Sequence, residues 1–331
     1  RLEWTRRSVA LRTAHAAAHG TVRERELFDV SLGEGRGEAA PLESYDGVPA
    51  DLVEAALRAF RDAIASLPAD APGPQILETC RAVADLPQAL AAVDLALWDR
   101  AARRAGKPVA QLLADDPLPA VPVNATIAAE DRAGAADAAA AAVRAGYRCV
   151  KVKVGLGDDA GRVAAVRALA GPDVALRLDA NGAWTVDEAV LSLATLAPAG
   201  LELVEEPVHG IAALRAVRER VPVRIAMDET AAEHGALASG ATDAVCLKVS
   251  RCGGIAGTLA AAALVRALGG EVYLASTLDG PLGIAAALHC AAALRVELPC
   301  GLATLGGLEL DDRFPPIAGT MLVPSGPGLL S

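Results

Sequence analysis

Three acidic residues close successive apolar segments in the second half of the chain and are the first candidates for chemistry. Asp179, Glu205 and Asp228 follow one another at intervals of about 25 residues. Neighbouring parallel strands lie about 4.8 Å apart, so carboxylates at their ends would converge. Two like charges about 4 Å apart cost about 4 kcal/mol at an effective dielectric constant near 20. A hard divalent cation removes that cost, and oxygen-only ligation favours Mg²⁺, or else Mn²⁺, over zinc.

Three lysines flank these acids. Lys151 and Lys153 stand two residues apart in one apolar segment, so the strand period of two places both on the same side. Lys248 belongs to a later segment and would face them across a ligand. We expect the metal and a second ammonium to lower the pKa of a lysine enough for it to act as a base.

A cation with opposed lysines suits removal of a proton α to a carboxylate, through a metal-stabilised enediolate. Two bases on opposite faces of the substrate would permit racemisation or epimerisation. One base with one spectator cation would permit β-elimination or cycloisomerisation. The sequence leaves these alternatives open.

The elements that must position these residues alternate between β-branched and Ala/Leu/Arg-rich segments. The candidate strands are Val121–Ile127, Cys149–Val154, Val174–Asp179, Leu201–Glu206, Arg224–Glu229, Ala244–Val249, Val272–Thr277 and Cys300–Leu305. This alternation predicts a parallel sheet with helical crossovers. Eight strands over about 190 residues fit a (β/α) barrel, whose active sites lie at the carboxyl ends of the strands.

The first part of the chain has a different pattern. Residues 1–42 read as strands and 50–115 as helices, with a long amphipathic helix over Leu86–Arg104 that ends near Gly106. A proline-rich stretch follows. We therefore predict an α+β capping domain at 1–117, a barrel at 118–305, and a C-terminal segment at 306–331 that returns to the capping domain.

Composition excludes several classes of protein. The chain has 331 residues, of which 53% are hydrophobic, and this argues against disorder. Its net charge of −10 argues against nucleic acid or an anionic membrane as partner. We find no apolar stretch of about 18 residues and no signal peptide, and the six cysteines include no CxxC pair. We therefore expect a cytoplasmic protein with reduced thiols; a homo-oligomer is compatible with the sequence, which does not define the oligomeric state.

Taken together, these residues resemble the enolase superfamily, and within it the muconate-lactonizing (muconate cycloisomerase) subgroup, whose members include o-succinylbenzoate synthases and dipeptide epimerases. The resemblance covers nearly the whole chain, including the segments Gly37-Glu38-Ala39-Ala40-Pro41 and Ala96-Leu97-Trp98-Asp99. It implies an α/β fold: a modified TIM barrel, (β/α)7β, with an N-terminal α+β capping domain. The resemblance is to the muconate-lactonizing subgroup rather than to the mandelate racemases, because the seventh predicted strand lacks the histidine base of the mandelate racemases.

The resemblance also implies roles for individual residues. Lys153 would be the base on the second strand, with Lys151 assisting by its charge, and Lys248 the base on the sixth. The implied Mg²⁺ ligands are Asp179, Glu205 and Asp228. Residues implied to orient these groups are Asn181, Glu229 and Arg251.

The substrate is expected to be a small carboxylate. Gly301–Leu308 and Leu278–Ile284 are similar to o-succinylbenzoate synthases, whereas Arg251 resembles a cation of racemising and epimerising relatives. The Asp-x-Asp of dipeptide epimerases is not evident near Thr304. We expect an isomerase (racemase, epimerase or cycloisomerase), with an o-succinylbenzoate synthase-type dehydratase as the alternative. A lid over Thr13–Tyr45 would set specificity, and the candidate substrate contacts are Arg12, Arg23, Arg25, Tyr45, Ser276, Asp279 and Thr304.

Overall fold

The computed structural model describes residues 1–17, 20–129 and 131–331, without the side chains of residues 14–21. The tip of the predicted lid, residues 18–19, therefore lies outside the described residues. Among the residues described, no helix has the length and apolar character needed to cross a membrane.

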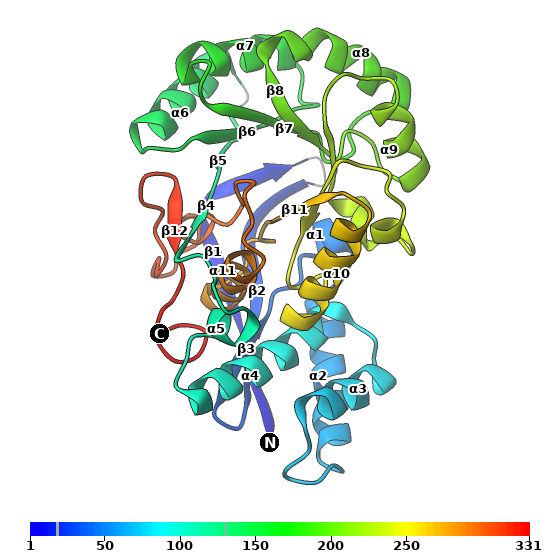
Figure 1. Ribbon diagram of the computed structural model, residues 1–331, viewed down its shortest axis with the longest axis vertical. Helices are drawn as coiled ribbons and strands as arrows, with labels where there is room; N and C mark the ends of the chain where they lie inside the picture. Colours follow the sequence, from blue (N-terminus) through cyan, green and yellow to red (C-terminus); the bar gives the residue numbers. More distant parts are fainter. Residues whose placement is uncertain (18–19, 130) are drawn as a thin grey trace.

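An antiparallel sheet and a group of helices form the first part of the molecule (Figure 1). The sheet has the order β1 (Leu2–Ala17), β2 (Gly20–Leu32) and β3 (Gly35–Ala39). The helices are α1 (Glu43–Asp46), α2 (Ala50–Ile64), α3 (Gly73–Val83), α4 (Pro87–Ala105) and α5 (Val109–Leu113).

Close packing of α4 on β3 explains two glycines. A side-chain carbon at Gly35 or Gly37 would collide with the carbonyl oxygen of Ala96 or Ala92 on α4. The helix ends at Gly106, whose φ of +64° is the left-handed conformation that favours glycine. The long helix predicted from the sequence is thus confirmed.

Seven parallel strands form the sheet of the second part, in the unbroken order β11-β10-β9-β8-β7-β6-β5. They are β5 (Ala125–Ile127), β6 (Cys149–Lys153), β7 (Ala175–Asp179), β8 (Leu201–Glu205), β9 (Ile225–Met227), β10 (Ala244–Leu247) and β11 (Glu271–Leu274). The helices along this part are α6 (Arg132–Arg144), α7 (Asp159–Ala170), α8 (Val186–Leu196), α9 (Ile211–Arg218), α10 (Ile255–Ala267) and α11 (Pro281–Ala293). The strands curl with helices outside them (Figure 1), so the predicted capped, modified TIM barrel is confirmed.

The last predicted strand, Cys300–Leu305, is wrong. Only two bridges form there, Cys300 with Val123 and Gly301 with Ala275, and they join the two edges of the sheet. Proline and glycine explain the difference: Pro299 has no N–H to donate, and glycine weakens a strand.

The predicted strand Val121–Ile127 is two strands. β4 (Ala120–Pro122) pairs antiparallel with β12 (Thr320–Leu322), and only β5 enters the barrel sheet. The chain after β12 reaches the first part of the molecule, because Leu329 N donates to Asp99 Oδ1 on α4 at 2.8 Å. The C-terminal segment therefore contacts both the start of the barrel and the helices before it.

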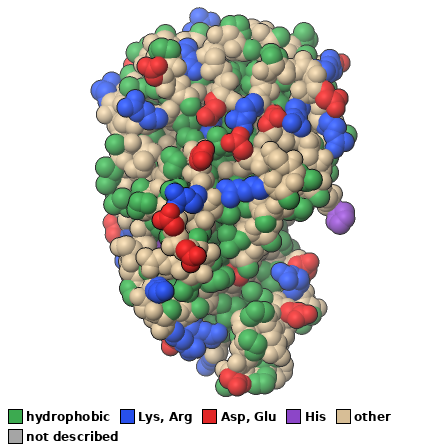
Figure 2. Space-filling model, viewed as in Figure 1, with side chains coloured by type: hydrophobic (Ala, Val, Ile, Leu, Met, Phe, Trp, Pro, Cys, Tyr) green, Lys and Arg blue, Asp and Glu red, His purple; other side chains and the backbone are tan. Residues whose placement is uncertain are grey.

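Charged side chains are mixed on the surface. Figure 2 shows Lys and Arg interspersed with Asp and Glu on one face, rather than a continuous basic area. The six cysteines are free thiols.

Candidate active site

The six residues singled out by spacing meet at one end of the barrel. Lys151 and Lys153 lie on β6, and Asp179 and Glu205 are the last residues of β7 and β8. Asp228 and Lys248 come directly after β9 and β10. All six are buried, with at most 9% of each residue exposed. We call these six residues the barrel-mouth cluster.

Ion pairs connect the cluster. Lys151 Nζ donates to Asp179 Oδ2 and to Glu205 Oε1, each at 3.0 Å. Lys153 Nζ donates to Asp179 Oδ2 at 2.7 Å, and Lys248 is paired with Asp228. Three acidic side chains thus face three amines within this buried space, and burial raises the pKa of one of the acids, Glu205, to about 7.

Two lysines of the cluster, Lys151 and Lys248, are held in their charged form by the acids around them. Burial by itself would lower the pKa of Lys151 and of Lys248, but the surrounding carboxylates outweigh it, and the pKa of both is raised. This rise comes from the chain's own groups, and the lowered lysine pKa expected beside a bound metal stays a prediction. Burial would raise the pKa of Asp179, yet Lys151 and Lys153 hold it below its ordinary value.

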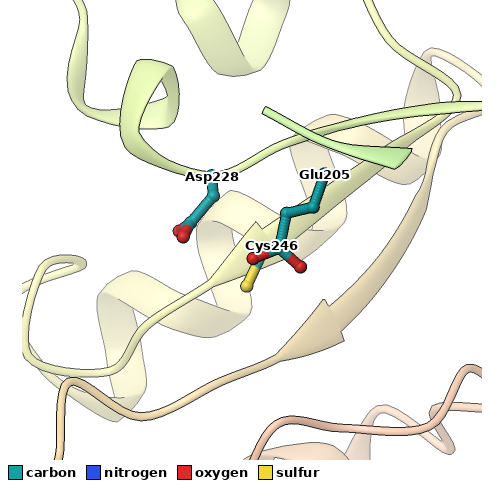
Figure 3. Close-up of side chains that lie close together, drawn as sticks. All are labelled: Glu205, Asp228 and Cys246. Atoms are coloured by element: carbon teal, nitrogen blue, oxygen red, sulfur yellow. The ribbon is translucent and has the colours of Figure 1, made fainter. Parts of the chain in front are cut away.

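The donor set fits a hard divalent cation. Ligand atoms of Glu205, Asp228 and Cys246 lie within 4.8 Å of one another (Figure 3). Burial holds the pKa of the Cys246 thiol well above its ordinary value, so it is a poor ligand. Asp179 lies outside that grouping and is joined to Glu205 through the ammonium of Lys151, which bonds both. Three buried carboxylates from consecutive strands are the oxygen ligands that Mg²⁺ prefers.

Glu206 belongs to a second acidic grouping, with His209 and Glu229. Its carboxylate accepts from Asp228 N at 2.7 Å and from Thr230 N at 3.0 Å, and it is fully buried. Glu206 therefore anchors the turn that presents Asp228.

The three residues expected to orient the cluster lie beside it. Asn181 Oδ1 accepts from Lys153 Nζ at 2.6 Å, and Asn181 Nδ2 donates to Glu229 Oε1 at 2.9 Å. Arg251 Nη2 donates to the carbonyl oxygen of Glu229 at 3.1 Å. This chain of hydrogen bonds fixes the position of the Lys153 ammonium.

Tyr45 connects the first part of the molecule to the cluster. From α1, its hydroxyl donates to Asp228 Oδ1 at 2.7 Å and accepts from Lys248 Nζ at 2.7 Å and Arg251 Nη1 at 3.0 Å. The Lys248 ammonium also lies 4.6 Å from the centre of the tyrosine ring. Tyr45 thus bonds a carboxylate and an amine of the barrel and also lines the cavity, and its role as a substrate contact stays a prediction.

A cavity of about 110 Å³ opens over the cluster. Its other lining residues are Val22, Leu42, Ser44, Tyr45, Thr126, Asn181, Ala275, Ser276, Thr277, Leu278, Gly301 and Thr304. Ser276 and Thr304, both predicted, are hydrogen-bonded at 2.7 Å. Away from the cluster, the described lining is apolar or hydroxyl-bearing apart from the amide of Asn181, and it carries no arginine and no further acid.

Four other candidates do not reach this cavity. Arg23 is exposed and lines a separate groove, and Arg12 donates to the carbonyl oxygen of Leu310 at 3.2 Å. Arg25 is buried and donates to backbone carbonyls, and Asp279 accepts from Thr277 Oγ1 at 2.7 Å. Their polar atoms are engaged within the protein or turned to solvent.

Sequence reasoning missed several residues that line the cavity or bond the acids beneath it. Thr126 and Thr277 lie at or just after strand ends, so the rule that found the acids could have found them as well. Tyr273, which donates to Glu205 Oε2 at 2.6 Å, lies within β11 and gives no such signal. Ser44 and Leu42 reach the cavity only because the two parts of the molecule dock.

Comparison with known proteins agrees with this geometry. Residues 3–114 match the N-terminal domain of mandelate racemase/muconate lactonizing enzymes, and residues 134–330 match the enolase C-terminal domain-like family. The chain belongs to the mandelate racemase/muconate lactonizing enzyme family of the enolase superfamily. The resemblance found in the sequence is thus confirmed.

Curated relatives in this family differ in their reactions. The chain is 35% identical to a chloromuconate cycloisomerase of Cupriavidus necator over 244 residues, 71% of this chain and 66% of the relative. It is 40% identical to an o-succinylbenzoate synthase of Thermobifida fusca over 217 residues, 61% of this chain and 66% of the relative. The matches therefore span just under two-thirds of these relatives' lengths.

Solved structures in the family are similar over the whole chain. The L-Ala-D/L-Glu epimerase from Bacillus subtilis has a TM-score of 0.90 at 29% identity, covering 99% of this chain and 97% of that one. A dipeptide epimerase from Enterococcus faecalis, complexed with Mg and L-Leu-L-Tyr, has a TM-score of 0.90 at 28% identity, covering 99% and 98%.

Proposed function

We propose that this protein is a magnesium-dependent enzyme that removes the proton α to the carboxylate of a small substrate. The observation that carries the proposal is the pairing of three buried acids with three lysine amines in the barrel-mouth cluster. A divalent cation held by Asp179, Glu205 and Asp228 would supply two positive charges to a carboxylate that becomes more negative as its α-proton leaves.

The lysines have distinct tasks in this proposal. Lys151 bonds two of the metal-ligand carboxylates and so contributes charge and orientation. Lys153 and Lys248 come from β6 and the end of β10, which are separated in the sheet by β7, β8 and β9. They can therefore reach opposite faces of a substrate whose carboxylate lies between them. A divalent cation on the carboxylates would offset the negative charge that raises the pKa of Lys248, and each amine could then take or return a proton at Nζ.

Two bases on opposite faces support a racemase or epimerase, and one base beside a spectator cation supports a cycloisomerase of the muconate-lactonizing type. An o-succinylbenzoate synthase-type dehydratase is the second candidate, supported by the 40% identity to a synthase. Dipeptide epimerisation is not proposed, because an α-ammonium would find no acid in the described lining beyond the metal-ligand carboxylates. The six free thiols support our proposal of a reducing, cytoplasmic location.

Turnover in deuterium oxide separates the two candidates. The enzyme with Mg²⁺ would be incubated with N-acylamino acids, muconates and the o-succinylbenzoate synthase substrate. A racemase or epimerase incorporates deuterium at the α-carbon of both stereoisomers, a cycloisomerase converts muconate to a lactone, and a dehydratase changes the ultraviolet absorbance as water is lost. Absence of exchange and of turnover with the whole panel, in a folded protein that binds Mg²⁺, would contradict the proposed function.

A further inference from the structure

Two segments that are far apart in the sequence meet where the antiparallel sheet docks against the barrel. Glu38, on β3, has an Oε1 that accepts from Gly280 N at 2.7 Å and from Gly283 N at 3.3 Å. These N–H groups belong to the start of α11, which has no side-chain cap of its own. The first N–H groups of a helix lack partners within the helix, so Glu38 caps α11 from another part of the molecule.

The fit between these segments is tight. Glu38 is 3% exposed, and a side-chain carbon at Gly280 or at Gly283 would collide with its carboxylate. Both glycines are therefore required by the close approach of Glu38, which explains the Gly-Pro-Leu-Gly sequence at 280–283.

Arg25 makes a second connection at the same interface. It is 2% exposed, and its guanidinium donates to the carbonyl oxygens of Ala40 and Pro41 and, at 3.3 Å, to that of Leu278. Leu278 has a φ of +58°, a left-handed conformation that costs energy for leucine. Arg25 and Glu38 thus hold the loop after β11 at two points, residue 278 and residue 280.

That loop is one wall of the cavity, since Ser276, Thr277 and Leu278 all line it. We propose that Glu38 and Arg25 are positioning residues, which couple docking of the antiparallel sheet to the shape of the substrate pocket. The expected effect on substrate binding rests on the proposed function. The expected effect on the position of the loop does not depend on it.

The charges around Glu38 make this connection sensitive to pH. Asp279 faces it from the loop, Asp29 and Arg25 from β2, and Arg7 from β1. Burial first, and then Asp279 and Asp29, raise the pKa of Glu38 to about 8, against the opposing effects of the Gly280 N–H and Arg7. The neutral side chain is therefore favoured below about pH 8.

Hydrogen exchange tests the connection without a substrate. Amide exchange of a peptide covering residues 274–283 would be followed by mass spectrometry in the wild type, Glu38→Ala, Glu38→Gln and Glu3→Gln. Glu3 is the control because its side chain is 61% exposed on the same sheet. Glu38→Ala is expected to speed exchange at Gly280 and Gly283 about tenfold, while Glu38→Gln, whose amide oxygen can accept both bonds, stays within about twofold of the wild type.

Exchange in Glu38→Ala that matches the wild type would overturn the proposal. If Glu38→Ala fails to fold, the comparison of the wild type with Glu38→Gln tests whether Glu38 holds the loop. After correction for base-catalysed exchange, the wild-type loop should lose protection progressively between about pH 4.5 and about pH 8, the two pKa values of Glu38, and the Gln variant should not. Identical pH profiles in the two proteins would contradict the proposal.

Kinetics give a second readout. With whichever substrate the deuterium experiment identifies, Glu38→Ala should raise KM about tenfold and change kcat less than about threefold, because the wall contacts substrate away from the reacting atoms. A fall in kcat with unchanged KM would overturn a positioning role. If no substrate is turned over by the wild type, the proposed function fails while the exchange experiment still decides the role of Glu38.

Discussion

Two of the buried groups of charged residues in the described part of the chain are built differently. In the barrel-mouth cluster, side chains of opposite sign pair with one another beneath an open cavity. At the docking interface, Arg25, Glu38 and Asp279 bond mainly to backbone groups and to Thr277. Buried charge alone is therefore no sign of catalysis. A paired set facing a cavity can do chemistry, whereas charges that bond the backbone shape the structure.

Metal removal gives the largest expected difference between the two groups. A chelator should abolish turnover, and added Mg²⁺ should restore it, because the substrate's developing charge depends on the cation. Mg²⁺ should also raise the Tm of the wild type and of Glu38→Gln, but not of Asp179→Asn, since only Asp179 is a proposed ligand. Differential scanning fluorimetry and an activity assay check this. Full activity in chelator would show that the reaction does not need a metal ion.

Loss of a lysine amine should have the second-largest effect on activity. With Mg²⁺ present, Lys248→Ala should lower kcat about 10³-fold, the size typical of a lost general acid or base. The exposed Lys107→Ala serves as the control and should keep full activity. If both faces are used, Lys153→Ala and Lys248→Ala should each block deuterium exchange from one stereoisomer only. Equal loss for both isomers would favour a single base.

A smaller effect is expected at Tyr45, which contacts the barrel-mouth cluster from the other part of the molecule. Tyr45→Phe removes the hydroxyl that bonds Asp228, Lys248 and Arg251, and should lower kcat/KM about tenfold. Steady-state kinetics measure this, with Tyr147→Phe as the control. A variant as active as the wild type would show that docking and chemistry are independent.

The smallest expected effect is on stability at the docking interface. The pKa of Glu38 is raised from 4.5 to about 8, so its contribution to stability is fully present below about pH 4.5 and is lost as pH rises through 8. The Tm of the wild type should therefore fall by a few degrees relative to Glu38→Gln between about pH 5 and about pH 9. Thermal melts across that range check this, and a constant Tm difference would contradict it.

The same contrast explains what could be predicted from sequence. The residues of the barrel-mouth cluster recur at strand ends, so the period of the fold reveals Asp179, Glu205 and Asp228 in advance. The last predicted strand, Cys300–Leu305, does not form as a strand, because Pro299 and Gly301 leave only two bridges there.

The docking interface has no such period. The contact from Glu38 to Gly280 joins residues 242 positions apart, and nothing local in either segment indicates the other. The sequence predicts Arg25 as a substrate contact because a guanidinium can donate to a carboxylate. In the structure it donates to three backbone carbonyls, and the sequence gives no sign of which acceptor it binds.

The central claim is that three acids share one cation opposite the lysines. A crystal soaked in Mn²⁺, measured for anomalous scattering, tests it most directly. The account predicts one strong peak within about 2.2 Å of oxygens of Asp179, Glu205 and Asp228. A peak instead among Glu206, His209 and Glu229, or no peak with the acids still paired to the lysines, would contradict it.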